Sequence, residues 1–196
     1  SLRSYLKEGG TVILSAGDMI DREYYNSRLF LEEQGIMMSI LGAPTSPEEP
    51  VSLDIKSTLP GPLGFLRNMA PSLSELIHFN TYFDIRESQM STPAVVDIRY
   101  TNGVPAVIHA GVGRGRTFFL NFTLDEAWTD FPLHPLYLPF MRELVYSCVK
   151  YSGDRFEAKC GTPLSIRVPF SASDDTFIIE TPDNKQLSVK PYFKNE

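Results

Sequence analysis

The residues with the clearest capacity for chemistry lie in one segment, residues 121–132, which contains Asp125, Trp128 and Asp130. The segment joins a predicted strand to a predicted helix, and ligands in open α/β sheets favour loops that leave the carboxyl ends of strands. Two carboxylates and an indole in such a loop could bind a small polar ligand or a sugar. In the alternative, Trp128 fills the core and the two aspartates cap the loop and the helix. Both interpretations stay open on the sequence.

A second candidate is the glycine-rich run Gly111-Val-Gly113-Arg-Gly115-Arg116, whose composition resembles that of a phosphate-binding loop. Such a loop needs a strand before it and a helix N-terminus after it, so that backbone N–H groups converge on the anion. Here an aromatic-rich strand follows the run, and the GxGxxG spacing is not met. We therefore predict a hairpin turn.

Nucleophilic hydrolysis would require an elbow of the form G-x-S-x-G or G-x-C-x-G, and the sequence has neither. Cys148 lies on the apolar stripe of a predicted helix, and Cys160 lies at the edge of a predicted strand. The two could form a disulfide in an oxidising compartment, or both could be isolated thiols. His78, His109 and His134 are not part of a His-x-Glu pair, which an amidotransferase triad would need.

Other site signatures are equally weak. The sequence lacks H-x-x-x-H, C-x-x-C and D-x-D-x-D patterns, so it predicts no metal ion and no cofactor. The triplet Asn121-Phe-Thr123 matches a glycosylation acceptor, but it would matter only in a eukaryotic secretory setting. No catalytic residue is predicted, and the expectation leans away from an enzyme.

Composition limits the possible partners. The chain has 196 residues, a net charge of −6 and a pI near 5.1, so clustered phosphates of nucleic acid and anionic lipid surfaces are poor ligands. No apolar run approaches the length of a membrane helix, which is about 20 residues. The chain has no initiator Met and begins with a helical pattern, so we expect either a piece of a longer protein or a processed form.

The first 40 residues have the alternating order of helices and strands that is typical of an α/β domain. A helix is predicted near residues 2–6 and ends at Gly9-Gly10, and the β-branched run 11–15 predicts a strand buried in a parallel sheet. Asp21 can cap a helix over residues 22–34, with Gly35 after its end. Residues 42–72 are rich in proline and glycine, with short helices expected at 63–69 and 73–79.

Residues 94–122 predict a β-meander in which Asn102-Gly103 forms the first tight turn. A helical stripe follows: Leu133, Leu136, Tyr137, Phe140, Met141, Leu144, Val145 and Cys148. After residue 153 the pattern changes to alternation at 164–168, 176–180 and 186–190, which is typical of antiparallel strands. We therefore predict an α/β domain over residues 1–153 and a small antiparallel β-module, itself incomplete, over residues 154–196.

Several motifs together suggest a family: Leu6-x-x-Gly9-Gly10-Thr-Val-Ile-Leu, Gly103-x-Pro105, Gly111-x-Gly113-Arg-Gly115-Arg, Leu124-Asp125-x-x-Trp128-x-Asp130-Phe131-Pro132 and Pro139-Phe-x-x-Glu143-Leu. Their combination covers about residues 1–150 and is strongest at 111–143. It resembles the extracytoplasmic region of BatA-like bacterial membrane proteins. The segment from Cys160 onward is similar to the β-module that follows in such proteins.

The resemblance implies an incomplete class I glutamine amidotransferase-like, flavodoxin-like sheet that lacks its first strands. It also implies a parent protein anchored in the bacterial inner membrane by absent segments, with this region on the periplasmic side. The Cys and His-x-Glu motifs of the amidotransferases are not matched, so their activity is not implied.

Three functional hypotheses follow. The first is a non-catalytic interaction or scaffold domain whose partners are other envelope proteins. The second is an amidotransferase-like or other hydrolase whose nucleophile lies outside this chain. The third is a binding module for a small polar ligand or sugar, which would use Asp125, Trp128 and Asp130.

Overall fold

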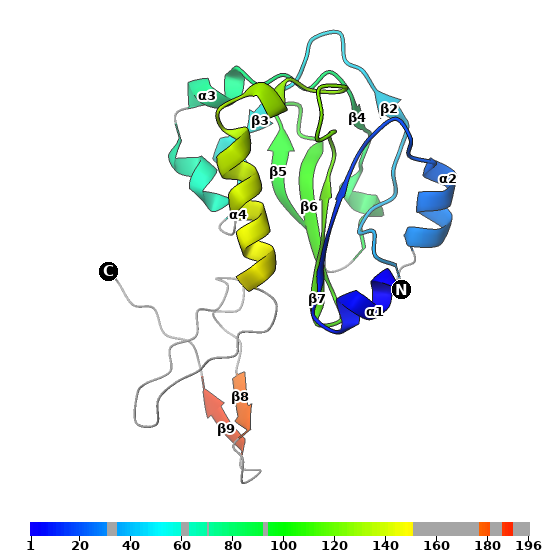
Figure 1. Cartoon of the computed structure of the whole chain (residues 1–196), viewed down its shortest axis with the longest axis vertical. Helices are drawn as coiled ribbons and strands as arrows, with labels where there is room; N and C mark the ends of the chain where they lie inside the picture. The colour runs from blue at the N-terminus through cyan, green and yellow to red at the C-terminus, as the bar shows by residue number, and fades with distance from the viewer. Residues whose placement is uncertain are drawn as a thin grey trace. The chain divides into compact units, whose positions relative to one another are not determined.

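The computed structural model describes residues 1–30, 35–59, 63–69, 71–91, 94–150, 177–180 and 186–189. The chain divides into two compact units, Ser1–Asp154 and Arg155–Glu196. The boundary expected from the sequence lies one residue before this division. The first unit is a sheet with helices on both faces (Figure 1).

The sheet of the first unit has five described strands in the order β1-β7-β6-β5-β3. They are β1 (Thr11–Ser15), β3 (Leu53–Asp54), β5 (Val95–Tyr100), β6 (Pro105–Val112) and β7 (Gly115–Leu120). The pairing of β1 with β7 is parallel, and the other described pairings in this sheet are antiparallel. The α/β class is therefore confirmed. The flavodoxin-like arrangement stays a prediction, because most of this sheet is antiparallel.

The predicted meander is present, with its turns where glycine was expected. Gly103 has a φ of 89° in the turn between β5 and β6, and Gly113 has a φ of 64° between β6 and β7. Both are left-handed conformations that favour glycine. The run from Gly111 to Gly115 is thus the predicted hairpin turn. Strand β6 begins at Pro105 itself, the first residue of a strand being one of the positions in a sheet where proline is found.

Helix α4 (Tyr137–Lys150) covers one face of the sheet. Phe140 and Leu144 pack there with Phe118, Leu120 and Phe122, and burial of each large apolar side chain contributes about 1.5–3 kcal/mol. The predicted helix start at Leu133 is wrong. His134 precedes a proline and is extended, with a ψ of 141°, because the residue before proline avoids the helical region.

The predicted apolar stripe is consequently shorter than its sequence pattern. The 3-10 turn η5 (Phe131–Leu133) comes before α4, and Leu133 is 68% exposed on it. Val145 is 49% exposed. The buried part of the stripe is limited to Leu136, Phe140 and Leu144, with Tyr137, Met141 and Cys148 partly buried.

The opposite face is covered by α2 (Arg22–Tyr24), the π-helical turn η1 (Tyr25–Leu29) and the segment that follows them. The Asp21 carboxylate accepts from the backbone N–H of Tyr24 at 3.1 Å, as the predicted cap should. The helix ends earlier than expected. Phe30 is extended. The backbone N–H groups of Ile36 and Met37 donate to the Leu29 carbonyl, so this carbonyl bonds the returning chain and not a further turn of helix.

At the N-terminus, α1 (Leu2–Lys7) is capped by Ser1 and ends before Gly9, whose φ is 103°. The proline-rich connection is organised by short elements: β2 (Pro44–Thr45), η2 (Ile55–Ser57), η3 (Gly64–Asn68), α3 (Pro71–Glu75), β4 (Tyr82–Phe83) and η4 (Glu87–Gln89). The helix expected at 73–79 instead spans Pro71–Glu75. Phe79 forms β-bridges with Val51 and Thr129, and its ring lies in an aromatic cluster with Tyr100, Phe122 and Phe131.

In the second unit, β8 (Phe177–Glu180) and β9 (Gln186–Val189) form an antiparallel pair. Their presence confirms the last two strands predicted from alternation. The predicted strand at 164–168 and Cys160, with its possible disulfide, lie outside the described residues.

Candidate functional site

The carboxyl ends of β1 and β7 lie side by side, because these strands are parallel and in register from Thr11–Arg116 to Ser15–Leu120. The loops that leave them therefore meet at one end of the sheet. With β2 and β4 they enclose a groove of about 470 Å³, here called the strand-end groove. Its lining residues are Gly17, Asp18, Ile20, Arg22, Pro44, Ser46, Thr81, Phe83, Ala127 and Trp128.

Trp128 forms one wall of the strand-end groove. It is 5% exposed, and its ring meets that of Phe83 edge-on with centroids 5.3 Å apart. Its indole Nε1–H donates to Asp18 Oδ1 at 2.7 Å, and its carbonyl accepts from the N–H of Asn80 at 2.7 Å. At this low exposure, nearly all of the indole ring is used for packing. The contribution of Trp128 to the groove is to hold the Asp18 carboxylate in one orientation.

The polar groups of the groove come from three loops. Asp18 is exposed and uses one carboxylate oxygen for Trp128. The hydroxyls of Ser46 and Thr81 are 2.9 Å apart, which brings β2 and β4 together at the rim. Arg22 adds a guanidinium at the start of α2. A carboxylate, two hydroxyls and a guanidinium can hydrogen-bond a polar ligand, but they do not form a nucleophile–base pair.

Of the residues singled out from the sequence, only Trp128 lines this groove. The Asp125 carboxylate accepts from the N–H of Ala127 at 3.0 Å, within its own loop. The Asp130 carboxylate accepts from the backbone N–H of His78 and bonds its ring Nδ1, both at 2.7 Å. Both aspartates thus bond their own surroundings. That Asp125 and Asp130 contact a ligand stays a prediction, and their internal hydrogen bonds do not favour it.

Sequence reasoning missed Asp18, Arg22, Ser46 and Thr81. Asp18 could have been found, because it comes three residues after the predicted strand 11–15, in the loop at the carboxyl end where ligands bind. Ser46 and Thr81 carry no such signal. They meet only because the two-residue strands β2 and β4 pair, and strands of that length are not readable from a pattern.

Asn121 supports the groove through its hydrogen bonds to Phe83, a lining residue. It is fully buried, and its side-chain oxygen accepts from the N–H of Phe83 at 2.9 Å. Its side-chain nitrogen donates to the carbonyls of Phe83 and Pro105. Since all of these bonds are internal, Asn121 is no glycosylation acceptor in the folded chain. It fixes β4, and with it Phe83, against the sheet.

Two histidine–aspartate pairs lie elsewhere. His109 Nδ1 is 2.7 Å from Asp97 Oδ2 on the neighbouring strand, and His78 pairs with Asp130. Such a pair becomes catalytic only when its second ring nitrogen meets a nucleophile. The Cys148 thiol instead bonds the carbonyl of Leu144, and burial raises the pKa of Cys148 above its usual range. The described residues contain no cluster of three or more His, Cys, Asp or Glu side chains able to hold a metal ion.

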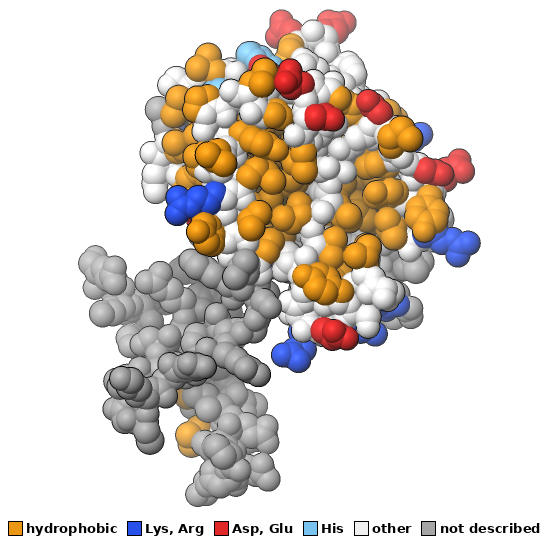
Figure 2. Space-filling model, viewed as in Figure 1, with side chains coloured by type: hydrophobic (Ala, Val, Ile, Leu, Met, Phe, Trp, Pro, Cys, Tyr) orange, Lys and Arg blue, Asp and Glu red, His pale blue; other side chains and the backbone are white. Residues whose placement is uncertain are grey.

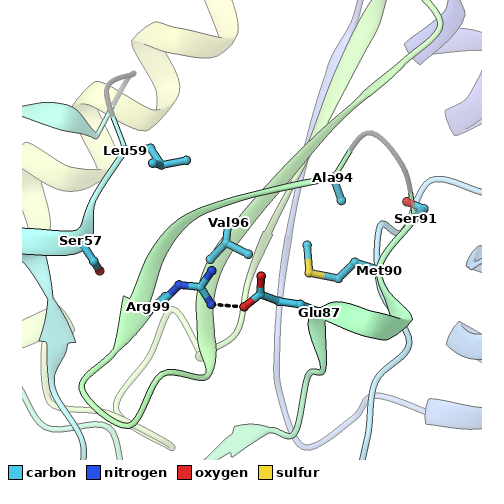
Figure 3. Close-up of a pocket in the computed structure, with 8 residues that line it drawn as sticks. All are labelled: Ser57, Leu59, Glu87, Met90, Ser91, Ala94, Val96 and Arg99. Carbon is cyan, nitrogen blue, oxygen red and sulfur yellow. Dashed lines mark hydrogen bonds and ion pairs between the residues drawn. The ribbon is translucent and has the colours of Figure 1, made fainter. Parts of the chain in front are cut away.

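A second hollow of about 340 Å³ lies beside β5 (Figure 3). Its charged residues are Arg99 and Glu87, which form an ion pair with each other. Arg99 also donates to the carbonyl of Gly103. Because its two charges already neutralise each other, this hollow is a weaker candidate than the strand-end groove.

No protein-family model matches the chain, and no curated protein matches it in sequence. Solved structures similar to it include the cytoplasmic protein STM3548 from Salmonella typhimurium, with a TM-score of 0.50, 14% identity and 74% of this chain covered. Another is the cytoplasmic protein STM1381 from Salmonella typhimurium LT2, with a TM-score of 0.52, 12% identity and 75% covered. The chain spans 57% and 58% of the lengths of these proteins. This similarity shows the α/β fold alone.

The periplasmic, membrane-anchored location expected from the sequence is contradicted by these neighbours, which are described as cytoplasmic proteins. That expectation came from the family motifs alone. Among the described residues, no helix combines the length and hydrophobicity needed to cross a membrane. The resemblance to BatA-like proteins and to amidotransferases stays a prediction.

Proposed function

We propose that this chain is a binding domain for a small, hydroxyl-rich polar ligand, held in the strand-end groove. One observation carries the proposal: the groove lies at the carboxyl ends of the parallel pair β1 and β7, with an oriented carboxylate at its edge. This end of an α/β sheet is the usual place for a ligand. The proposal keeps Trp128 from the sequence-based site and replaces Asp125 and Asp130 with Asp18.

The chemistry of the lining favours hydroxyl groups over apolar ligands. Asp18 can accept from a ligand hydroxyl with its second oxygen, and a charged acceptor makes the stronger kind of hydrogen bond. Ser46 and Thr81 can donate and accept, and Arg22 donates. The volume of about 470 Å³ lies within the range of about 300–1,000 Å³ that is usual for small-molecule sites.

The test is a thermal-shift screen of sugars and polyols, followed by calorimetric titration of any ligand found. A ligand at 100 times its Kd stabilises the folded state by about 2.7 kcal/mol. We expect Asp18→Asn to weaken binding about tenfold, because it replaces the charged acceptor. Glu23→Gln is the matched control, since it makes the same charge change on α2 outside the groove. Equal affinities of the two variants would refute the placement of the site.

The interaction-domain hypothesis is a second candidate, and a different observation favours it. Strand β1 has an outer edge that pairs with none of the described strands. The hydrolase hypothesis places its nucleophile outside this chain, so the groove does not bear on it, and it stays a prediction.

A further inference from the structure

The outer edge of β1 carries backbone groups in the geometry of a sheet. The Gly10 carbonyl accepts from Arg116, and the Ala16 N–H donates to Leu120. In a parallel ladder the bonding residues alternate along the strand. The even-numbered residues therefore face β7, and the N–H and C=O groups of Thr11, Ile13 and Ser15 point away from it. No described strand takes these groups.

The strand lacks the features that usually protect an edge. Its sequence Thr-Val-Ile-Leu-Ser contains no charge and no proline, and its five residues pair with β7 without a bulge. Exposed edges of this kind readily pair with another strand. All five residues are only partly buried, although Ile13 packs against one core cluster and Leu14 against the other. An added strand would complete that burial.

The surroundings of the edge are apolar on both sides. In Figure 1, β1 lies between α4 on one side and α1 and α2 on the other. Figure 2 shows, in the same view, hydrophobic side chains gathered over α4 and towards α2, with a strip of other atoms between them. Exposed apolar residues on these helices include Tyr5, Tyr24, Val145 and Tyr146, each about half exposed. An occupant of the edge would therefore be flanked by apolar surface.

Charge differs between the two ends of this edge. At the end near Gly10, Lys7 contacts the turn at Gly113, and Arg114 follows in that turn. Beyond Ser15 lie Asp18 and the loop that carries Asp125 and Glu126. Figure 2 shows acidic side chains at the upper end of the unit and mostly basic ones at its lower end. The edge is thus complementary in charge to a reversed copy of itself.

We propose that β1 pairs with β1 of a second copy of this chain, antiparallel and about a two-fold axis at Ile13. Thr11 then bonds Ser15 of the second copy, and Ile13 bonds Ile13 of the second copy, so every outward N–H meets a C=O. The contact is isologous, and closed pairs of this kind are the commonest oligomers. It places α4 beside α4 of the second copy and joins the two sheets into one. It does not rest on the proposed ligand.

The first test is sedimentation of the whole chain from micromolar to near-millimolar concentration, with hydrogen exchange followed residue by residue. We expect a monomer–dimer equilibrium, and slower exchange of the Thr11, Ile13 and Ser15 amides as the dimer forms. The Val12 and Leu14 amides, which face β7, should be protected at all concentrations. A chain that stays monomeric throughout would overturn the proposal. So would a dimer in which those three amides exchange as they do in the monomer.

A proline at position 11 tests the edge directly. Thr11→Pro removes an outward N–H at the first residue of an edge strand, a position where proline is tolerated. We expect the dimer Kd to rise about tenfold or more, since the two-fold axis removes the bond twice. Thr11→Val is the control, because it keeps the N–H and removes a hydroxyl that has no described partner. Equal dimerisation of the two variants would refute the pairing; if Thr11→Pro fails to fold, the exchange measurement on the unmodified chain decides.

Discussion

At the scale of single residues, Tyr100 and Asn121 connect the core to the groove. The Tyr100 hydroxyl donates to the Asn121 carbonyl at 2.6 Å, and both residues are almost fully buried. The pKa of Tyr100 is raised well above its usual value of 10.0, mainly by burial and to a smaller extent by the neighbouring Tyr82. A buried phenol resists ionisation because the phenolate would lose its hydration.

This pKa shift predicts a loss of stability in alkali. In the unfolded chain Tyr100 ionises near pH 10, while in the folded chain it keeps its proton. Its contribution is therefore complete below about pH 10 and is lost as the pH rises towards the folded-state pKa. We expect the free energy of unfolding, measured by urea titration from pH 8 to pH 11, to fall above about pH 10.

In the variant Tyr100→Phe, the free energy of unfolding should fall less steeply over that pH range. Its value at pH 8 should be lower than that of the unmodified chain, because the hydrogen bond to Asn121 is lost. Tyr5→Phe is the control, since Tyr5 is 53% exposed and makes no such bond to the core. The same slope in Tyr100→Phe and in the unmodified chain would show that another group causes the alkaline loss.

At the scale of elements, Gly115 fixes the approach of α1 to the sheet. A Cβ at this position would overlap the carbonyl oxygens of Gly10 and Leu6, which belong to backbone and cannot move aside. We expect Gly115→Ala to lower the free energy of unfolding by about 2 kcal/mol or more. Gly111→Ala, in the same hairpin, meets no atom within 4 Å. Urea denaturation should place it within about 1 kcal/mol of the unmodified chain, and equal losses would contradict the packing argument.

Elements set by local sequence were predictable, whereas those set by distant contacts were not. The turn at Gly103 and the strands on either side follow from turn chemistry and β-branched residues. The end of the helix before Phe30 depends on Ile36 and Met37 returning to Leu29, which no local pattern encodes. The residues of the groove show the same difference between local and distant contacts. Trp128 was found within its loop, while Ser46 and Thr81 meet across 35 residues of chain.

At the scale of the whole molecule, the two units are separate in the chain. We expect a protein that ends at Asp154 to keep the thermal midpoint of the full chain, because the sheet and both of its cores belong to the first unit. Differential scanning calorimetry measures this directly. A midpoint lowered by several degrees would show that residues after 154 stabilise the first unit.

The parallel pairing of β1 with β7 also has a consequence for synthesis on the ribosome. Arg116, the partner of Thr11, is translated roughly 100 residues after it, a wait of roughly 5–20 s at ordinary elongation rates. During that interval the edge of this uncharged, β-branched strand that will pair with β7 is open, and the residues that β7 contributes to the two core clusters are still missing. Nascent chains of this protein should therefore depend on holding chaperones until the meander is complete, and faster translation of residues 16–120 should improve the yield of folded protein.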